Sequence, residues 1–398
     1  MILENFYYAV LARIGSWLSG RNWLWKLTFF SVGLSVFLAF PPYHLFLKHL
    51  AGTGHLDAWT FIENQSHNLF RPEGIGVDVR RENMIFRWTL PLLSFLTGHN
   101  LLLILIIQAM LGVLFIYWIG SYIFKLTGNK VTTALFVLSV SNIFVGNWHF
   151  TEVHGYGDGI AYFCLLAAML HPNRIVRFFM LMAAFFTDER GVLAGGFILL
   201  WNIVNIAYTR NVFDLKNLFL SVFRGKNLTI WIAWAVYFSI RYYVQSKYFQ
   251  GHTYSTMGMP VLFEQAHRNG LGSSLWGVFE GTWLLLLACG TVIWLTRKYM
   301  LGLMLLTGFI VLIISGIYVH DIDRSLSYGF PLLFIAFFVL HQTTSNTAFQ
   351  LVLFFCALIC VMHPQVFYMG YNRVLWLEPL PLKMFQFLDR VYSWHLFD

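Results

Sequence analysis

The stretch Leu101–Lys125 reads LLLILIIQAMLGVLFIYWIGSYIFK and carries no charge before its final lysine. An α-helix rises about 1.5 Å per residue, so about 20 apolar residues cross the hydrocarbon core of a bilayer, which is about 30 Å thick. The stretch therefore predicts a membrane-spanning helix, and this prediction decides the fold class.

The composition agrees with a membrane location for the whole chain. Hydrophobic residues make up 58% of the 398 residues, charged residues make up 11%, and the mean hydropathy is +0.64. Soluble domains carry about 25% charged residues, so most of this surface is not in water. We predict a single all-α membrane domain over 1–398, which begins with an amphipathic helix over 1–20 on the membrane surface. No basic run or RNA-binding signature is present, which argues against a nucleic acid partner.

The other apolar blocks predict a polytopic bundle of about eleven transmembrane helices. Lysine and arginine gather in alternate short loops, which places the N-terminus in the cytoplasm. The segments 48–99 and 364–398 then lie on the extracytoplasmic side, and we expect interfacial helices in the first of them. This topology fits a bacterial inner membrane or the endoplasmic reticulum. The predicted spans are 24–47, 100–124, 130–148, 156–171, 173–187, 190–207, 227–243, 276–296, 300–318, 326–341 and 347–363.

The acidic residues are distributed unevenly across this topology. Of the 18 Asp and Glu residues, only Glu4 and Asp214 fall on the cytoplasmic side. The positive-inside rule concerns basic residues and predicts little about acidic ones. We therefore interpret the extracytoplasmic face as polar and chemically active.

The first candidate motif is Gly54–Trp59, about ten residues beyond the first predicted span. Its carboxylate, Asp57, would sit at the membrane surface and could act as a general base toward an attacking hydroxyl. His55 and Glu63 lie nearby in the sequence, and Glu63 is the first substitute for Asp57. The alternative for Asp57 is a helix N-cap or a solvated loop residue.

The second candidate motif, Thr151–Gly159, holds three titratable residues among three glycines. Glycine lets the backbone approach a ligand closely, so we expect Glu152 and His154 to contact substrate. Asp158 would begin the next helix, where the helix dipole alone favours a carboxylate. For Asp158, the capping and ligand-binding roles stay open.

The third candidate motif contains Asp188, Glu189 and Arg190 between two apolar blocks. Ionisable groups at membrane depth are costly, so they pair with one another or line a polar cavity. A structural Asp–Arg clamp between two helix ends is the alternative to a substrate site. Both readings predict that these side chains face the protein interior.

The fourth candidate motif begins at His320 and includes Asp321, Asp323 and Arg324. A guanidinium held in place by a carboxylate is suited to binding a phosphate group. Asp321 and Asp323 could instead bind a divalent cation such as Mg²⁺ or Mn²⁺, but two carboxylates are too few to complete its coordination, so we assign no metal ligands and leave the cation open as a cofactor.

Basic residues of the first external segment are further candidates for phosphate binding. Arg80 and Arg81 could contact a phosphate, whereas for Arg87 we favour contact with lipid head groups.

This pattern resembles the GT-C superfamily of integral-membrane glycosyltransferases, whose members use polyprenyl-phosphate sugars as donors. The resemblance rests on the predicted topology, on Asp57 soon after the first span, and on the charged motif at Asp188–Arg190. It implies that Asp57 is the catalytic base in an inverting transfer to an acceptor hydroxyl of a glycan, lipid or protein. It also implies that Arg190, Arg324 or the pair Arg80–Arg81 stabilises the departing polyprenyl phosphate. Glu152, His154 and Asp188 would orient the sugar hydroxyls.

Two other classes stay open on the sequence. A polymerase or ligase of lipid-linked glycans shares the topology and the substrates. A flippase-type transporter would need charges near the bilayer midplane and broken helices, and the sequence indicates neither.

Overall fold

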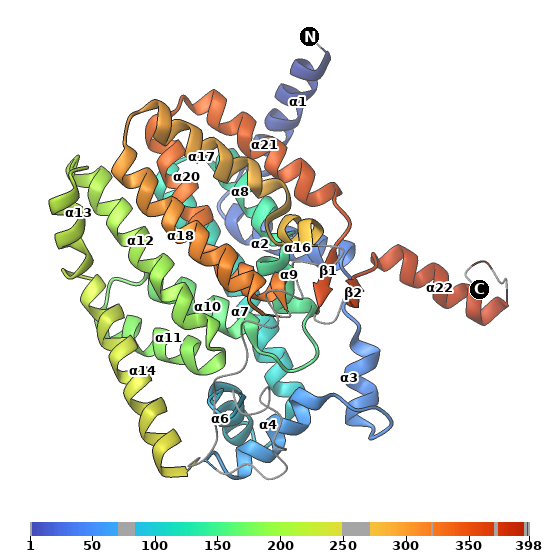
Figure 1. Ribbon diagram of the computed structural model, residues 1–398. Coiled ribbons are helices and arrows are strands. Elements are labelled where there is room, and N and C mark those ends of the chain that lie inside the picture. Colours follow the sequence, from blue (N-terminus) through green and yellow to red (C-terminus); the bar gives the residue numbers. More distant parts are fainter. Residues whose placement is uncertain are drawn as a thin grey trace.

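The computed structural model of the chain describes residues 2–70, 84–248, 271–319, 321–369, 373–393 and 396 (Figure 1). The predicted all-α class is confirmed, with one addition. Strands β1 (Val366–Met369) and β2 (Arg373–Trp376) pair antiparallel near the C-terminus. The first helices in chain order are α1 (Ile2–Trp17), α2 (Trp23–Leu38), α3 (Tyr43–Leu50), α4 (Asp57–His67), α6 (Thr89–Leu96), α7 (Leu101–Thr127), α8 (Lys130–Ser141), α9 (Phe144–Thr151), α10 (Asp158–Leu170) and α11 (Arg174–Thr187).

The second half of the chain is built in the same way. It comprises α12 (Arg190–Arg210), α13 (Leu215–Val222), α14 (Asn227–Tyr248), α16 (Leu271–Phe279), the 3-10 turn η1 (Glu280–Thr282), α17 (Trp283–Leu295), α18 (Tyr299–Ile317), α19 (Ile322–Ser327), α20 (Pro331–Thr343), α21 (Asn346–Met362) and α22 (Leu380–Tyr392).

Fewer helices can span a membrane than the sequence predicted. Within the described residues, four are long and apolar enough, namely α7, α12, α18 and the segment Leu271–Leu295. The number rises to six if α2 with α3 and α8 with α9 each count as one span, although these pairs bend by 81° and 60°. The chain is therefore a candidate multi-pass membrane protein, and the prediction of about eleven spans is wrong.

The short apolar helices explain this difference. α10 and α20 have 13 residues each, which makes them about 20 Å long, well short of the hydrocarbon core. Every residue of α20 from Pro331 to Leu340 is buried by the rest of the protein. These helices are apolar because they fill the protein interior. Hydropathy alone does not distinguish such a buried helix from one that contacts lipid.

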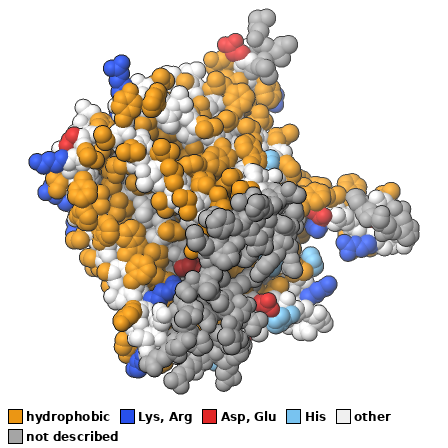
Figure 2. Space-filling model, in the orientation of Figure 1, with side chains coloured by type: hydrophobic (Ala, Val, Ile, Leu, Met, Phe, Trp, Pro, Cys, Tyr) orange, Lys and Arg blue, Asp and Glu red, His pale blue; other side chains and the backbone are white. Residues whose placement is uncertain are grey.

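The surface between the helix ends is largely apolar. Figure 2 shows hydrophobic side chains over much of one face, with lysine and arginine scattered, mostly around its outline. On α18, Leu303, Leu306 and Ile314 are exposed, as a helix against lipid would be. α7 contacts α9 closely at Gly112, where a Cβ atom would lie 2.5 Å from the Cβ of His149.

Several shorter elements agree with the sequence prediction. The N-terminal helix is present as α1, and the segment 48–99, where helices were expected, contains α4 and α6 among its described residues. α10 begins at Asp158, as predicted. α4 and α6 pack together at one end of the bundle, next to the turns that carry most of the candidate residues (Figure 1).

Candidate functional site

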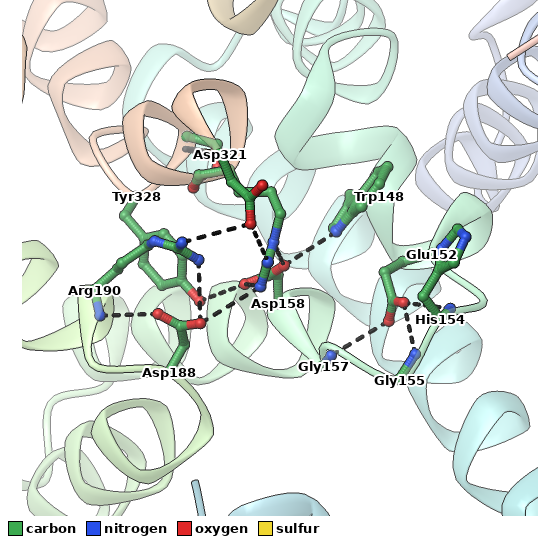
Figure 3. Close-up of polar contacts among 12 residues, drawn as sticks. Trp148, Glu152, His154, Gly155, Gly157, Asp158, Asp188, Arg190, Asp321 and Tyr328 are labelled. Atoms are coloured by element: carbon green, nitrogen blue, oxygen red, sulfur yellow. Dashed lines mark hydrogen bonds and ion pairs between the residues drawn. The ribbon is translucent and has the colours of Figure 1, made fainter. Parts of the chain in front are cut away.

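Seven charged side chains from four parts of the chain meet where several helices end. We call them the charged cluster; Figure 3 shows several of its contacts. Three of the four predicted motifs contribute to it. Its members are Arg87, Asp158, Asp188, Glu189, Arg190, Asp321 and Arg324.

Arg324 is the hub of the charged cluster. Its Nε donates to Oδ2 of Asp158 at 2.7 Å, and its Nη1 donates to Oδ2 of Asp321 at 2.9 Å. Its Nη2 is shared between Asp158 at 3.3 Å and Asp188 at 3.5 Å. The ring of Tyr156 lies 4.0 Å from the guanidinium carbon. The geometry thus uses the fork shape of arginine on several carboxylates at once.

Asp158 is fully buried at the first residue of α10, where the helix dipole favours a carboxylate. Besides Arg324, the hydroxyl of Tyr328 donates to Oδ1 at 2.8 Å and the indole of Trp148 donates to Oδ2 at 3.2 Å. Burial alone would raise the pKa of Asp158, but the charge and hydrogen bonds of Arg324 lower it below the ordinary value. The carboxylate is therefore charged and fully hydrogen-bonded.

The turn between α11 and α12 supplies the second half of the charged cluster. Oδ1 of the buried Asp188 accepts from the backbone N–H of Arg190 at 3.0 Å, which fixes the turn. Oδ2 of Asp188 lies 3.2 Å from Nη1 of Arg190 and 3.1 Å from Nη2 of Arg87. The prediction that these charges face the interior is confirmed for Asp188, which is inaccessible to solvent.

Arg87 and Glu189 form a two-pronged ion pair. Nε of Arg87 donates to Oε2 of Glu189 at 3.0 Å, and Nη2 donates to Oε1 at 2.9 Å. Burial alone would raise the pKa of Glu189, but Arg87 lowers it to about 2. The expectation that Arg87 contacts lipid head groups is therefore wrong, because its guanidinium is turned to Glu189 and Asp188.

The charged cluster has a closed inner part and an accessible rim. The side chains of Asp158, Asp188 and Arg324 are at most 2% exposed, whereas those of Arg190, Arg87 and Asp321 are 12%, 14% and 16% exposed. Arg190 uses one side-chain N–H in a hydrogen bond to the described residues and lies 3.9 Å from Asp321. A guanidinium has five N–H donors, so the described residues leave Arg190 with donors for a further anion.

Glu152 is hydrogen-bonded within its own loop, and its contact with substrate stays a prediction. Its Oε1 accepts from the backbone N–H groups of His154 at 2.6 Å and Gly155 at 2.8 Å, and its Oε2 accepts from Gly157 at 3.3 Å (Figure 3). The buried carboxylate thus holds its own loop together. His154 is half-buried beside it; burial and the nearby Arg324 lower the pKa of its imidazole, so the ring is neutral at neutral pH.

Glycine makes this loop possible. Gly155 and Gly157 adopt φ angles of +92° and +74°, which favour glycine. A Cβ at Gly155 would lie 2.8 Å from the ring of Trp59. The Trp59 indole in turn donates to the carbonyl of Val153 at 2.8 Å, which anchors α4 to the loop.

Asp57 lies apart from the charged cluster. Its side chain is 83% exposed, and its Oδ1 lies 3.0 Å from Nε2 of His55, which is 66% exposed. No hydrogen bond or ion pair joins Asp57 to the charged cluster within the described residues. Glu63 is half-exposed on α4, and Asp323 is buried in α19. Arg80, Arg81 and His320 lie outside the described residues.

Sequence reasoning did not assign three residues to this region, namely Trp148, Tyr328 and Arg87, the last of which it named as a phosphate candidate but assigned to lipid head groups. Trp148 and Tyr328 lie within predicted spans, so their side chains could not be distinguished from ordinary core aromatics. The sequence could have indicated a buried, paired Arg87, because this residue follows an apolar pair and precedes a short helix at the same face as Glu189. No group of three His, Cys, Asp or Glu side chains in the described part of the chain is arranged to hold a metal ion.

Comparisons with known proteins identify no relative. No family model, curated protein or solved structure matches the chain. The chemistry therefore has to be argued from the charged cluster itself, which offers guanidinium donors at its rim and fixed carboxylates behind them. Such an arrangement is suited to binding a phosphate or another oxyanion.

Proposed function

We propose that this protein is a multi-pass membrane glycosyltransferase. It would move a sugar from a polyprenyl-phosphate donor to an acceptor hydroxyl at the extracytoplasmic face, with inversion. The observation that carries the proposal is the meeting of Arg87, Arg190 and Arg324 with fixed carboxylates at the ends of apolar helices. A lipid-linked phosphate needs an anion site at the depth of the membrane interface, with apolar surface beside it for the lipid chain.

Arg190 is the residue that we propose contacts the phosphate. Within the described part of the chain it leaves donors unused at the accessible rim, and Asp188 holds its backbone and side chain in one place. Arg324 would stabilise the phosphate by its charge and without direct contact, because its N–H groups already bind Asp158, Asp188 and Asp321. Preorganised positive charge of this kind stabilises a leaving phosphate as its charge develops in the transition state.

In the proposed reaction, the acceptor oxygen attacks the anomeric carbon while the bond to the phosphate oxygen breaks. The electron pair leaves with polyprenyl phosphate, and a base removes the acceptor proton. The sequence assigns this base to Asp57. Its helix, α4, is anchored through Trp59 to the loop that carries Tyr156, and the Tyr156 ring lies over Arg324.

The test is transfer by the purified protein in liposomes that contain a radiolabelled polyprenyl-phosphate sugar and a panel of acceptors. We expect a glycosylated product from the unmodified protein. Arg190→Ala should lower kcat/KM about 100-fold, as the loss of one charge-stabilising donor typically does. Arg210→Ala, an exposed arginine at the other end of α12, is the matched control and should leave the rate unchanged. Absence of any product with every donor and acceptor would overturn the proposal.

A flippase-type transporter is the second candidate, because one observation favours it. The bends between α2 and α3 and between α8 and α9 supply the broken helices that transporters of lipid-linked or small substrates use. The same liposomes separate the two classes. A transporter moves the lipid-linked sugar between leaflets without forming product, whereas the transferase consumes the donor.

A further inference from the structure

The helix α22 stands apart from the rest of the bundle, and Figure 1 shows it pointing away from the other helices. One side of α22 is apolar. Its exposed apolar residues are Met384, Phe385, Phe387, Val391 and Tyr392. Residues three, four and seven positions apart lie on one face of a helix, so these side chains form a continuous stripe. α22 is therefore an amphipathic helix, and the described part of the protein leaves its apolar face open.

The polar face of α22 is the face that the chain itself occupies. Lys383 forms an ion pair with Glu378, and the side-chain amide of Gln386 donates to the same carboxylate at 3.2 Å. One turn further on, the carboxylate of Asp389 accepts from the backbone N–H of Leu396 at 2.9 Å. These contacts use the polar side and leave the apolar side pointing outward. An outward apolar face of this kind marks an interaction surface.

α22 is attached where a candidate membrane span ends. The backbone carbonyl of Glu378, just before α22, accepts from the N–H of Phe40, just after α2, at 3.0 Å. α22 also contacts α2 itself. α3 follows the same point and lies at 81° to α2. If α2 crosses the bilayer, α3 runs nearly along the membrane surface, and α22 begins at the depth of the lipid head groups.

Basic side chains gather where α3 and α22 meet. The charges of Lys48 on α3 and of Lys383 and Arg390 on α22 all act on the imidazole of His44. Lys48 and Arg390 are exposed, and neither forms an ion pair with the described residues. The nearby acid Glu378 is already paired with Lys383. Exposed cations beside an apolar helix face are suited to the phosphates of anionic lipids.

α3 repeats the pattern of α22. Tyr43, Leu47 and Leu50 are exposed at helical spacing, while Phe46 packs inward. Tyrosine favours the boundary between lipid and water, and it stands in both apolar faces, as Tyr43 and Tyr392. A protein partner would have to cover two separate helix faces at the end of a span, whereas a bilayer meets both. The lipid surface is therefore the occupant that these faces fit.

We propose that α22 and α3 lie on the membrane surface as two amphipathic anchors that bind anionic lipids. Their apolar faces enter the outer part of the hydrocarbon region, and Lys48 and Arg390 lie at the level of the lipid phosphates. This inference concerns a second surface of the molecule and does not depend on the proposed transferase activity.

The attachment of α22 leads back to the charged cluster. The backbone N–H of Leu377, just before α22, donates to the carbonyl of Gln365 at 2.9 Å. The side chain of Gln365 accepts from Asn147 of α9, and the next residue of α9, Trp148, donates to Asp158. An anchor on the membrane surface thus holds the charged cluster at a fixed depth relative to the lipid head groups.

The first test locates the apolar face by spin labelling of the full-length protein in lipid nanodiscs. The four native cysteines are buried, so single labels can be attached in Phe387→Cys on the apolar face and in Arg390→Cys on the polar face. Oxygen concentrates in the bilayer and a nickel chelate stays in water, so relaxation by each reagent reports the surroundings of the label. The Phe387→Cys label should respond mainly to oxygen, and the Arg390→Cys label mainly to nickel.

Two results of this labelling would overturn the proposal. A Phe387→Cys label that responds mainly to nickel would show that the apolar face is in water. A label shielded from both reagents, or broadened by a second spin, would show that a protein partner or a second copy of this chain covers the face.

The second test concerns the lipid head groups. Hydrogen–deuterium exchange of the α22 backbone is measured in nanodiscs of phosphatidylglycerol and of phosphatidylcholine. A basic residue close to an anionic surface strengthens binding about fivefold, so exchange should be slower in phosphatidylglycerol. The double variant Lys48→Gln with Arg390→Gln should lose this difference, whereas Arg210→Gln, an exposed control at the end of α12, should keep it. Equal exchange of the unmodified protein in the two lipids, or a difference that survives the double variant, would overturn the binding of anionic lipids.

Discussion

Arg324 shows how a single buried residue can hold several segments in register. Its guanidinium contacts carboxylates from α10, from the α11–α12 turn and from the start of α19. Removing two opposite charges from water costs several kcal/mol per ion, and such a pair repays this only with close geometry and saturated hydrogen bonds. Asp158 meets that condition, because Arg324, Tyr328 and Trp148 all donate to it.

Breaking this pair on one side should destabilise the protein more than removing it altogether. Arg324→Met leaves Asp158 charged and buried, and we expect a loss of about 3–5 kcal/mol of unfolding free energy. The double variant Arg324→Met with Asp158→Asn should recover a substantial part of that loss. Reversible unfolding in detergent micelles, followed by tryptophan fluorescence, measures both. Strictly additive losses in the double variant would contradict a direct ion pair.

At the scale of elements, the loop from Glu152 to Gly157 connects α9 and α4 to the charged cluster. The loop has little regular backbone hydrogen bonding. The Glu152 carboxylate satisfies three of its backbone N–H groups instead, by accepting a hydrogen bond from each. Its glycines lie against neighbouring side chains: a Cβ at Gly157 would sit 2.3 Å from Leu90 of α6. The loop therefore sets the distance between α6 and the buried Asp158.

Gly157→Ala tests this close approach. The substitution meets both a φ of +74° and the side chain of Leu90, so we expect a loss of about 2–4 kcal/mol from strain and overpacking together. Gly225→Ala is the matched control, with a φ of +61° and nothing within 4 Å of the new Cβ. It should cost about 1 kcal/mol. Equal losses in the two variants, measured by thermal unfolding, would contradict the packing argument.

The elements and the charged cluster differ in how far the sequence predicts them. Charges at the ends of apolar blocks, such as Asp158 and Asp188, stand out because water or a partner must satisfy them. Their convergence follows from tertiary packing, which the sequence does not contain. Arg87 was assigned to lipid because its partner, Glu189, is distant in the sequence.

Glu280 in η1 and His363 after α21, whose Oε1 and Nδ1 atoms lie 3.5 Å apart, were missed for another reason. Glu280 lies within the predicted span 276–296, where one acid among apolar residues gives no indication of strain or of a partner. His363 closes the last predicted span and looks like a helix-end residue. Their contact depends on the 3-10 turn η1, which interrupts the helical segment between α16 and α17. No sequence periodicity predicts this interruption.

At the scale of the whole molecule, the number of membrane crossings depends on which apolar helices face lipid. α10 and α20 are apolar but are enclosed by other helices, whereas α18 exposes most of its length. With fewer spans than predicted, the positive-inside rule still places the N-terminus in the cytoplasm only under one condition. The basic turns Lys125–Lys130 and Arg297–Lys298 must lie on the same side of the membrane. They follow α7 and α17, which both belong to the helices long enough to span.

Cysteine labelling decides this point. The four native cysteines are buried, so an impermeant maleimide should give little background on intact cells. Lys125→Cys and Thr296→Cys, both at exposed positions, should react only after the membrane is permeabilised, whereas Thr53→Cys, before α4, should react in intact cells. The reason is that basic turns stay with the cytoplasm, while the charged cluster and α4 lie at the opposite ends of the spans. Labelling of Thr296→Cys from outside would show that α17 and α18 have the opposite orientation. The candidate residues would then not share the membrane face on which the proposed function depends.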